Sequence, residues 1–471
     1  MQRTQSRWPR GSRLTMPTFP RAPLTITMVV GCHALFACQT YERRPLDLAA
    51  HRDAFVVRET QSEAVREMLS RAPADSQSCV SLEVAEELAL LLHPQLRLAR
   101  WRAGVAQATR DNAGLWADPS LGFDLTKILE GPSAGWELLG SVGLTLPVSG
   151  RLSRAKDAAQ ALLEVESLRI AALEWETRAT TRRAYIVWAA AHARCEEMRI
   201  YAERLARIVE LVAMLESRGE IARIEARLFR MEAIATQAAL IDLDARRTQS
   251  RTALLRELGL SPAATLAFDP AVLLQRTQRS SCEDGTSHPR IALAAAEYEA
   301  AERAIALEIE RQFPDLQIGP GYGEQDGDRQ FVLGLGITLP LWNANRQAIG
   351  ERAAEREVAR VAAEIAVESL VIERAVQQTD LAALQAQYDL QMHEVIPMVD
   401  AQSADVRRLA ELGGEVNALI LLDSLKRGRD AQLGLVDAAE SLRQAEIRWD
   451  ALCGPTVASS ETSAQKLETT P

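Results

Sequence analysis

The chain repeats itself about 195 residues further along. His-Pro-Gln-Leu at 93–96 returns as His-Pro-Arg-Ile at 288–291, and Pro-Ser-Leu at 119–121 returns as Pro-Asp-Leu at 314–316. Two further pairs keep this spacing: Gly219-Glu220-Ile221 with Gly414-Glu415-Val416, and Leu258-Gly259 with Cys453-Gly454. Markers spread over a long period indicate two copies of one structural unit.

Each copy contains a predicted β-hairpin. At 121–126 apolar residues alternate with Gly, Asp and Thr, and the same alternation follows the Gly-Pro-Ser turn at 131–133. The second copy repeats this pattern, most clearly at 331–339, and its Gly-Ile-Thr-Leu-Pro at 336–340 matches Gly-Leu-Thr-Leu-Pro at 143–147. Alternation with period two predicts strands with one apolar face and one polar or small face.

Long helices are predicted after each hairpin. About 60 residues near 152–215 and 346–412 contain almost no glycine or proline, apart from Gly350 and Pro397. At about 1.5 Å per residue such a helix would be about 90 Å long, too long for a compact globular domain. A composition of 47% apolar but only 5% aromatic residues is typical of long packed helices.

The first residues have the order of a secretion signal. Five arginines precede a short apolar run from Leu24 to Ala37, which ends in Leu35-Phe36-Ala37-Cys38. This ending resembles a bacterial lipoprotein cleavage site, so we expect Cys38 to be acylated and to become the mature N-terminus. Three alternatives stay open: cleavage before Cys32, a start at Met16, or a free buried Cys38 in a disordered leader.

The predicted strands require an oligomer. Two hairpins supply four strands of about 10 residues, which is the length that crosses a membrane as a tilted strand. Four antiparallel strands cannot close a barrel, and open edges in hydrocarbon leave unpaired amides that cost several kcal/mol each. Three chains would supply 12 strands, wide enough for an aqueous lumen. The alternative is a pair of soluble hairpins packed on a helical bundle.

Together, these features resemble the TolC-like outer-membrane factor family. The resemblance rests on the lipoprotein site, the two repeats, the strand endings Leu146-Pro147 and Leu339-Pro340, and the glycine-marked helical tips, and it covers roughly residues 81–454. It implies a mainly α fold with membrane β-hairpins: a homotrimer with a 12-stranded β-barrel, four strands from each protomer, continued by a long α-helical periplasmic barrel. The implied location is the outer membrane of a Gram-negative bacterium.

The expected organisation follows from the repeat. We expect a signal peptide at 1–37, a lipidated linker at 38–80, repeat 1 at 81–260 and a second linker at 261–287. Repeat 2 follows at 288–454, with a disordered tail at 455–471. The hairpins are expected at 119–147 and 314–340, and the tips of the helical hairpins near residues 219 and 414.

The resemblance also implies partners and contact residues. In the family the tip glycines dock a periplasmic adaptor, a membrane fusion protein. Carried over, the contact residues are Arg218, Gly219, Glu220, Gly413, Gly414 and Glu415. Family members often narrow the tip with rings of aspartate, and Asp423, nine residues after Gly414, would form one such gate. The His-Pro-x-Leu start resembles the Asn-Pro-x-Leu of members paired with resistance-nodulation-division pumps for heavy metals or drugs, with histidine in place of asparagine.

The cysteines and histidines suggest little chemistry. Cys79 and Cys282 each lie just before a repeat start, so a disulfide between them is one possibility in an oxidising periplasm, while Cys195 and Cys453 are expected to be buried singly. His93 and His288 occupy equivalent positions, yet the start of a helix before proline explains them more simply than a metal site. No catalytic or ATP-binding motif occurs.

The charge argues against nucleic acid as a partner. There are 64 acidic against 54 basic residues, a formal charge of -10, and no basic block of five or more. The resemblance implies a passive exit duct for small molecules or metal ions, without a cofactor other than the lipid on Cys38. Such a duct would be supplied by an inner-membrane pump and a periplasmic adaptor. The alternative is a periplasmic coiled-coil scaffold lipoprotein without a pore.

Overall fold

The computed structural model describes residues 41–58, 65–67, 79–127, 129, 136–275, 282, 288–325, 328–411 and 418–455. The chain divides into two units, Met1–Asp53 and Ala54–Pro471. The described part of the first unit holds most of helix α2 (Leu48–Val56), where the Asp47 carboxylate accepts a hydrogen bond from the backbone N–H of Ala50 at 2.9 Å.

The first copy runs from helix α5 to helix α8. Its elements are α5 (Leu82–Leu92), α6 (Pro94–Asp111), β1 (Ser120–Lys127), β2 (Trp136–Leu146), α7 (Arg151–Arg218) and α8 (Arg223–Glu257). The Ser81 hydroxyl caps α5 by accepting from the Val84 N–H at 3.4 Å. Proline is favourable at the first position of a helix because its missing N–H has no partner there, so Pro94 begins a new helix directly after His93.

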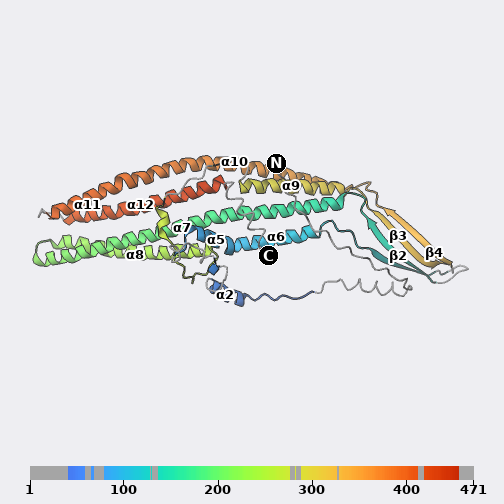
Figure 1. Ribbon diagram of the computed structural model, residues 1–471, viewed down its shortest axis with the longest axis horizontal. Coiled ribbons are helices and arrows are strands. Elements are labelled where there is room, and N and C mark those ends of the chain that lie inside the picture. Colours follow the sequence, from blue (N-terminus) through green and yellow to red (C-terminus); the bar gives the residue numbers. More distant parts are fainter. Residues whose placement is uncertain are drawn as a thin grey trace, which may run out of the picture. The chain divides into compact units, whose positions relative to one another are not determined.

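The second copy repeats this order. Its elements are α9 (Pro289–Glu310), β3 (Leu316–Gln325), β4 (Asp328–Ile337), α10 (Arg346–Leu390), the π-helical turn η5 (Gln391–Val395), α11 (Ile396–Glu411) and α12 (Ala418–Cys453). Figure 1 shows α9 running alongside α7 and α10, and both long helices contact it. A helix of the second copy thus lies between the long helices of both copies.

The second long helix is interrupted where the sequence predicted continuity. Pro397 has no N–H to donate to the carbonyl of His393, and its ring crowds that carbonyl. One turn of π-helix absorbs the mismatch, and the Ile396 N–H bonds to the carbonyl of Gln391 instead.

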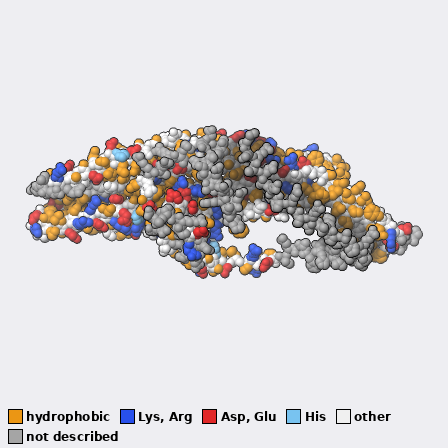
Figure 2. Space-filling model, in the orientation of Figure 1, with side chains coloured by type: hydrophobic (Ala, Val, Ile, Leu, Met, Phe, Trp, Pro, Cys, Tyr) orange, Lys and Arg blue, Asp and Glu red, His pale blue; other side chains and the backbone are white. Residues whose placement is uncertain are grey.

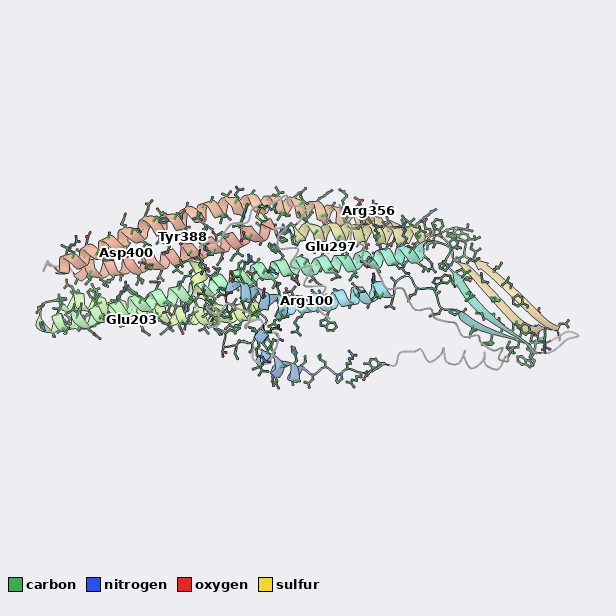
Figure 3. All side chains as sticks on the ribbon, viewed as in Figure 1. Arg100, Glu203, Glu297, Arg356, Tyr388 and Asp400 are labelled. Atoms are coloured by element: carbon green, nitrogen blue, oxygen red, sulfur yellow. A yellow bond between two sulfur atoms is a disulfide. The ribbon has the colours of Figure 1, made fainter. Side chains whose placement is uncertain are left out.

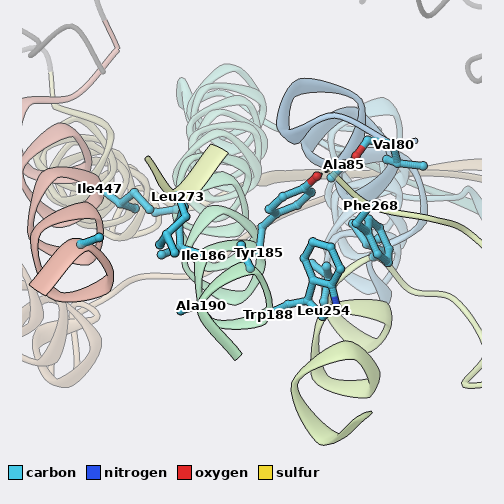
Figure 4. Packing of buried hydrophobic residues seen from close by; sticks show 14 of the residues in the cluster. Val80, Ala85, Tyr185, Ile186, Trp188, Ala190, Leu254, Phe268, Leu273 and Ile447 are labelled. Carbon is cyan, nitrogen blue, oxygen red and sulfur yellow. Dashed lines mark hydrogen bonds between the residues drawn. The ribbon is translucent and has the colours of Figure 1, made fainter. Parts of the chain in front are cut away.

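The main core joins α5, α7, α8 and α12 (Figure 4). Tyr185 lies at its centre, with its ring edge-on to Trp188 at 5.7 Å and to Phe268 at 5.8 Å. The Tyr185 hydroxyl donates to the carbonyl of Val80 at 2.7 Å and accepts from the Asp269 N–H at 2.8 Å. A buried phenol needs hydrogen-bond partners, and here they tie α7 to the segment before α5 and to the segment after α8.

The described part of the segment after α8, expected as a linker, belongs to this core. Phe268 and Leu273 are buried, and the 3-10 turn η3 (Pro270–Leu273) packs on α7. Val80 forms a parallel bridge with Phe268, and its N–H donates to the carbonyl of Ala267 at 2.7 Å. The Pro, Ser and Thr residues of 261–287 suggested a linker, whereas Phe268 and Leu273 are buried in the core.

Candidate channel sheet and helical tip

The two predicted hairpins form one antiparallel sheet. Among the described residues its strand order is β1-β2-β3-β4, so β2 and β3 join the two copies. The register pairs Leu144 with Ile318 and Ile318 with Leu335. The strands contain 8, 11, 10 and 10 residues in chain order, close to the length that spans a bilayer.

One face of this sheet is apolar and open. Phe123, Tyr322 and Phe331 share a row across the strands and remain 74%, 59% and 68% exposed. Leu121 and Leu335 lie on the same face, at 72% and 68%. Figure 2 shows hydrophobic side chains gathered over the part of the molecule that carries β3 and β4. An exposed apolar surface that crosses every strand of a sheet marks a membrane or protein contact.

The opposite face is mostly polar or small, with Val332 as an exposed apolar exception. Its rows include Gly122 with Ser141 and Gly321, and Gln317 with Gly336. A Cβ at Gly323 would lie 2.5 Å from the carbonyl oxygen of Leu138, so the close approach of β2 and β3 requires glycine there. This face can border water, while the other face can border hydrocarbon.

Acidic residues at the end of α9 form hydrogen bonds with the starts of both long helices. The Glu310 carboxylate accepts from the Gly150 N–H at 3.2 Å, at the start of α7. At the start of α10, the Asn345 side chain donates to the carbonyl of Glu308 at 2.9 Å and to its carboxylate at 2.7 Å. Negative charge at a helix N-terminus is favourable. The last turn of α9 therefore holds the strand-to-helix junctions of both copies, a contact that no local sequence pattern indicates.

The predicted tip of the first copy is a tight turn at the end of α7 that lies far from the strands (Figure 1). Gly219 has φ +77°, and the N–H groups of Gly219 and Glu220 bond to the carbonyls of Glu216 and Leu215, both at 3.0 Å. Nothing lies within 4 Å of a Cβ placed at Gly219, and Arg218 and Glu220 are exposed. The tip surface is open, but adaptor docking stays a prediction.

The other predicted tip residues, Gly413, Gly414 and Glu415, lie outside the described residues. So does Cys38.

Asp423 lies on α12, close to the start of that helix. Its carboxylate is exposed and accepts a hydrogen bond from Arg427, one turn further on, at 2.7 Å. The predicted acidic gate therefore has a basic partner within the same helix. The sequence shows Arg427 four residues after Asp423, which was the available signal for this pair.

A buried carboxylate links the two copies between the core and the tips. Glu232 on α8 accepts from the Tyr201 hydroxyl at 3.0 Å and pairs with Lys426 and Arg429 on α12, both at 2.6 Å. Burial raises the pKa of Glu232, but the hydrogen bonds from Lys426 and Tyr201 and the charge of Lys426 outweigh burial, so the pKa is lowered. No spacing in the sequence indicates this contact because it depends on how two helices of different copies pack.

The predicted disulfide between Cys79 and Cys282 is wrong. Cys282 is bonded to Cys453, and both Cys79 and Cys195 are free. The reason is geometric: α12 returns to the start of its own copy, so its last residue meets the segment just before His288. A Cβ placed at Gly454 would lie 3.3 Å from the His288 ring. The expectation that Cys195 is buried singly is met, whereas Cys453 is paired.

The two equivalent histidines serve as helix starts. The Nδ1 atom of His288 accepts from the Arg290 N–H at 3.2 Å, and Nε2 lies 3.0 Å from the carbonyl of Ala451. The Nε2 atom of His93 lies 3.8 Å from Glu257. Among the described residues no cluster of His, Cys, Asp or Glu is arranged to hold a metal ion.

His288 also borders a cavity of about 820 Å³ between α7, α9, α10 and α12. Charges of both signs line this cavity, including Arg183, Asp380 and Arg448. With both ring nitrogens of His288 occupied, the cavity offers no free imidazole.

Comparison with solved structures identifies the fold. A crystal structure of CusC, from a study of its folding and transmembrane channel formation, is 17% identical, with a TM-score of 0.65 over 80% of this chain and 92% of CusC. The outer-membrane channel CmeC of Campylobacter jejuni is 12% identical, with a TM-score of 0.68 over 96% and 97%. The outer-membrane protein VceC of Vibrio cholerae is 19% identical, with a TM-score of 0.63 over 79% and 96%.

The chain has the TolC-like outer-membrane channel fold. No protein-family model matches the sequence, and no curated protein does so either. The channel fold spans both copies, because the matched share of the chain is too large to fit within one of them. In the part of the chain that the structure describes, no helix is apolar and long enough to cross a bilayer.

Proposed function

We propose that this protein is the outer-membrane duct of a tripartite efflux system, a homotrimer that provides a passive exit path rather than an enzyme. In this proposal an inner-membrane pump delivers small molecules or metal ions through a periplasmic adaptor, and the duct releases them outside the cell. The pump is of the resistance-nodulation-division type. The channel fold and the two-faced sheet support this proposal.

The open apolar face of the sheet carries the argument. Residues such as Phe123, Phe331 and Leu335 would expose a large apolar surface to water in a single soluble chain. Facing hydrocarbon, the same residues gain their transfer free energy, about 25 cal/mol per Å² of apolar surface. A periplasmic scaffold lipoprotein, the alternative function, has no use for this face.

The sheet edges argue for a trimer. β1 and β4 lie at the ends of the strand order, so within one chain each has one side without a strand partner among the described residues. In a bilayer these backbone groups need partners, and a second chain can supply them by pairing its β1 with β4. Three chains with four strands each then close a 12-stranded barrel, whose polar and small face lines the lumen.

The helical tip is the proposed adaptor contact. The turn at Gly219 exposes Arg218 and Glu220, and its bare Cα allows another backbone to approach closely. The corresponding contact in the second copy would use Gly413, Gly414 and Glu415. A lipid on Cys38 would anchor the mature protein in the outer membrane, and the intact mass of detergent-extracted protein would reveal it.

Conductance and native mass together test the proposed function. The purified full chain, reconstituted in planar lipid bilayers, is expected to give stepwise currents, and native mass spectrometry in detergent should give the mass of three chains. Preparations of a non-conducting monomer would overturn the proposal. A conducting species with another number of chains would correct the trimer alone.

A further inference from the structure

The two copies meet within the chain where α9 packs on α7, and this interface is called the seam. Leu293, Ala296 and Ala300 of α9 contact Ala161 and Val165 of α7. Next to this apolar contact, Arg169 of α7 pairs with Glu297 of α9 at 2.8 Å. Figure 3 labels Glu297 on α9, beside α7.

The residues of α6 that correspond to these α9 residues in the repeat are exposed to solvent. Both helices begin at a His-Pro pair, 195 residues apart, and the same spacing relates Leu293, Ala296 and Ala300 to Leu98, Trp101 and Val105. These three α6 side chains are 52%, 79% and 68% exposed. α6 packs on α7 of its own copy, whereas α9 packs on the long helices of both copies. α6 therefore lacks the second long helix that α9 has.

The two charged residues of this contact have repeat equivalents that are also charged, but with the signs exchanged. The helix starts at Gly150 and Asn345 are also 195 residues apart, which relates Arg169 of α7 to Glu364 of α10. The same spacing relates Glu297 of α9 to Arg102 of α6. An Arg–Glu pair inside the chain thus corresponds to a Glu–Arg pair that one chain cannot form between its own α6 and α10.

Both residues are available for such a contact. Arg102 is exposed and forms no ion pair with any described residue of its own chain. The Glu364 side chain is 54% exposed and accepts from Arg360 through one oxygen, which leaves the other oxygen for a second donor. The contact between Ala296 and Val165 becomes Trp101 with Arg360, so a guanidinium can lie over an indole ring.

We infer that α6 of one subunit packs on α10 of the next, with Arg102 paired to Glu364 and Trp101 covered by Arg360. The partner is a second copy of this chain, in a head-to-tail contact that closes a ring. This interface rests on the proposed trimer and specifies how its subunits meet. Further from the strands, the pair between Arg194 and Asp437, 2.7 Å apart, maps onto Asp389 and Asp242, which have like charges. The interface is therefore assigned to the α6–α10 segment alone.

Cysteine cross-linking tests the register of this interface. The variant with Arg102→Cys and Glu364→Cys is made in the full chain, with Cys79→Ser and Cys195→Ser to remove the free thiols and with the Cys282–Cys453 bond kept. Mild oxidation is expected to give covalent dimers and trimers on non-reducing gels. The single-cysteine variants and the pair Gln107→Cys with Glu364→Cys, displaced by five residues along α6, are the controls and should stay monomeric on the gel.

The outcomes separate the interface from the duct. A conducting trimer by native mass without cross-links at 102 and 364 would overturn the interface and leave the proposed function standing. The interface would also be overturned by equal cross-linking of the displaced pair. A monomer would overturn both proposals.

Charge exchange provides a second measurement. Arg102→Glu alone should weaken subunit association about fivefold per contact, as for a modest ion pair. Combining it with Glu364→Arg should recover most of that loss. A double-mutant cycle removes the separate effect of Glu364→Arg on Arg360 in the same helix. Additive losses in this cycle would contradict the pairing.

Discussion

The pair between Asp423 and Arg427 determines what a ring of these residues would do to passing ions. Their exposed groups lie 2.7 Å apart, so each carboxylate has a positive charge beside it. At about 0.1 M salt, charges are screened beyond about 10 Å, and the local pair dominates. An ion near this ring would experience far less negative potential than three isolated aspartates would produce.

Substitutions of the two residues should therefore act in opposite directions. Asp423→Ala is expected to weaken block of the channel by divalent cations, because the carboxylate that attracts them is removed. Arg427→Gln should strengthen the block, because the carboxylate loses its partner. Single-channel recordings with and without millimolar divalent cation measure both effects. If neither variant changes block or conductance, Asp423 does not line the constriction.

His288 should make stability depend on pH. Burial lowers its pKa, and the charges of Arg290 and Arg374 lower it further. The folded state therefore disfavours the protonated form. Its stabilising contribution is fully present above the unfolded pKa of about 6.5 and is lost as pH falls below that value.

His288→Asn provides the matched test of this pH effect. Asparagine can still cap α9 through the Arg290 N–H, but it does not titrate. The variant should lose less thermal stability than the wild type between pH 7 and pH 5. Because the pKa of His192 is also lowered, mainly by burial, part of the wild-type slope should remain. Identical slopes in the two proteins would show that His288 does not contribute.

At the scale of elements, the bond between Cys282 and Cys453 holds the end of α12 against the start of its own copy. It closes a loop with a sequence separation of 171 residues. A cross-link over such a loop removes conformational entropy from the unfolded chain. Cys282→Ala should therefore lower the free energy of unfolding by about 2–4 kcal/mol.

Urea unfolding of the detergent-solubilised protein measures this loss, and dithiothreitol should lower the wild type to the level of the variant. Cys79→Ala is the control, because Cys79 is free and should change stability by no more than about 0.5 kcal/mol. A wild type that is insensitive to dithiothreitol would contradict the stabilising role.

The elements were predictable wherever a local pattern specifies them. Alternation at 331–337 predicted β4, and Gly219 marked the end of α7, because a strand face and a left-handed turn depend on neighbouring residues. The partner of Cys282 depends instead on where α12 ends in space, and no spacing in the sequence reports that. Phe268 was missed because its packing on Tyr185 depends on how the segment after α8 folds back onto α7. Glu232 was missed because its partners lie on α12, and the packing of α8 against α12 cannot be inferred from spacing in the sequence.

At the scale of the whole molecule, insertion in the membrane should depend on which face of the sheet is changed. Leu335→Arg places a charge on the apolar face, where it should destabilise the inserted state by about 2–4 kcal/mol near the bilayer centre. Gln317→Arg places the same charge on the polar face and should be tolerated. The amount of folded protein recovered from the membrane fraction compares the two variants. Equal recovery would contradict the assignment of the faces.

The seam between α7 and α9 also affects the order of assembly. Six separate copies would have to meet in five association steps, and each step would cost about 4–15 kcal/mol in translational and rotational freedom. With two copies in one chain, a three-chain ring needs only two such steps. The ring should then form with the third power of protein concentration rather than the sixth. Duplication would thus let a scarce membrane protein complete its ring at low abundance.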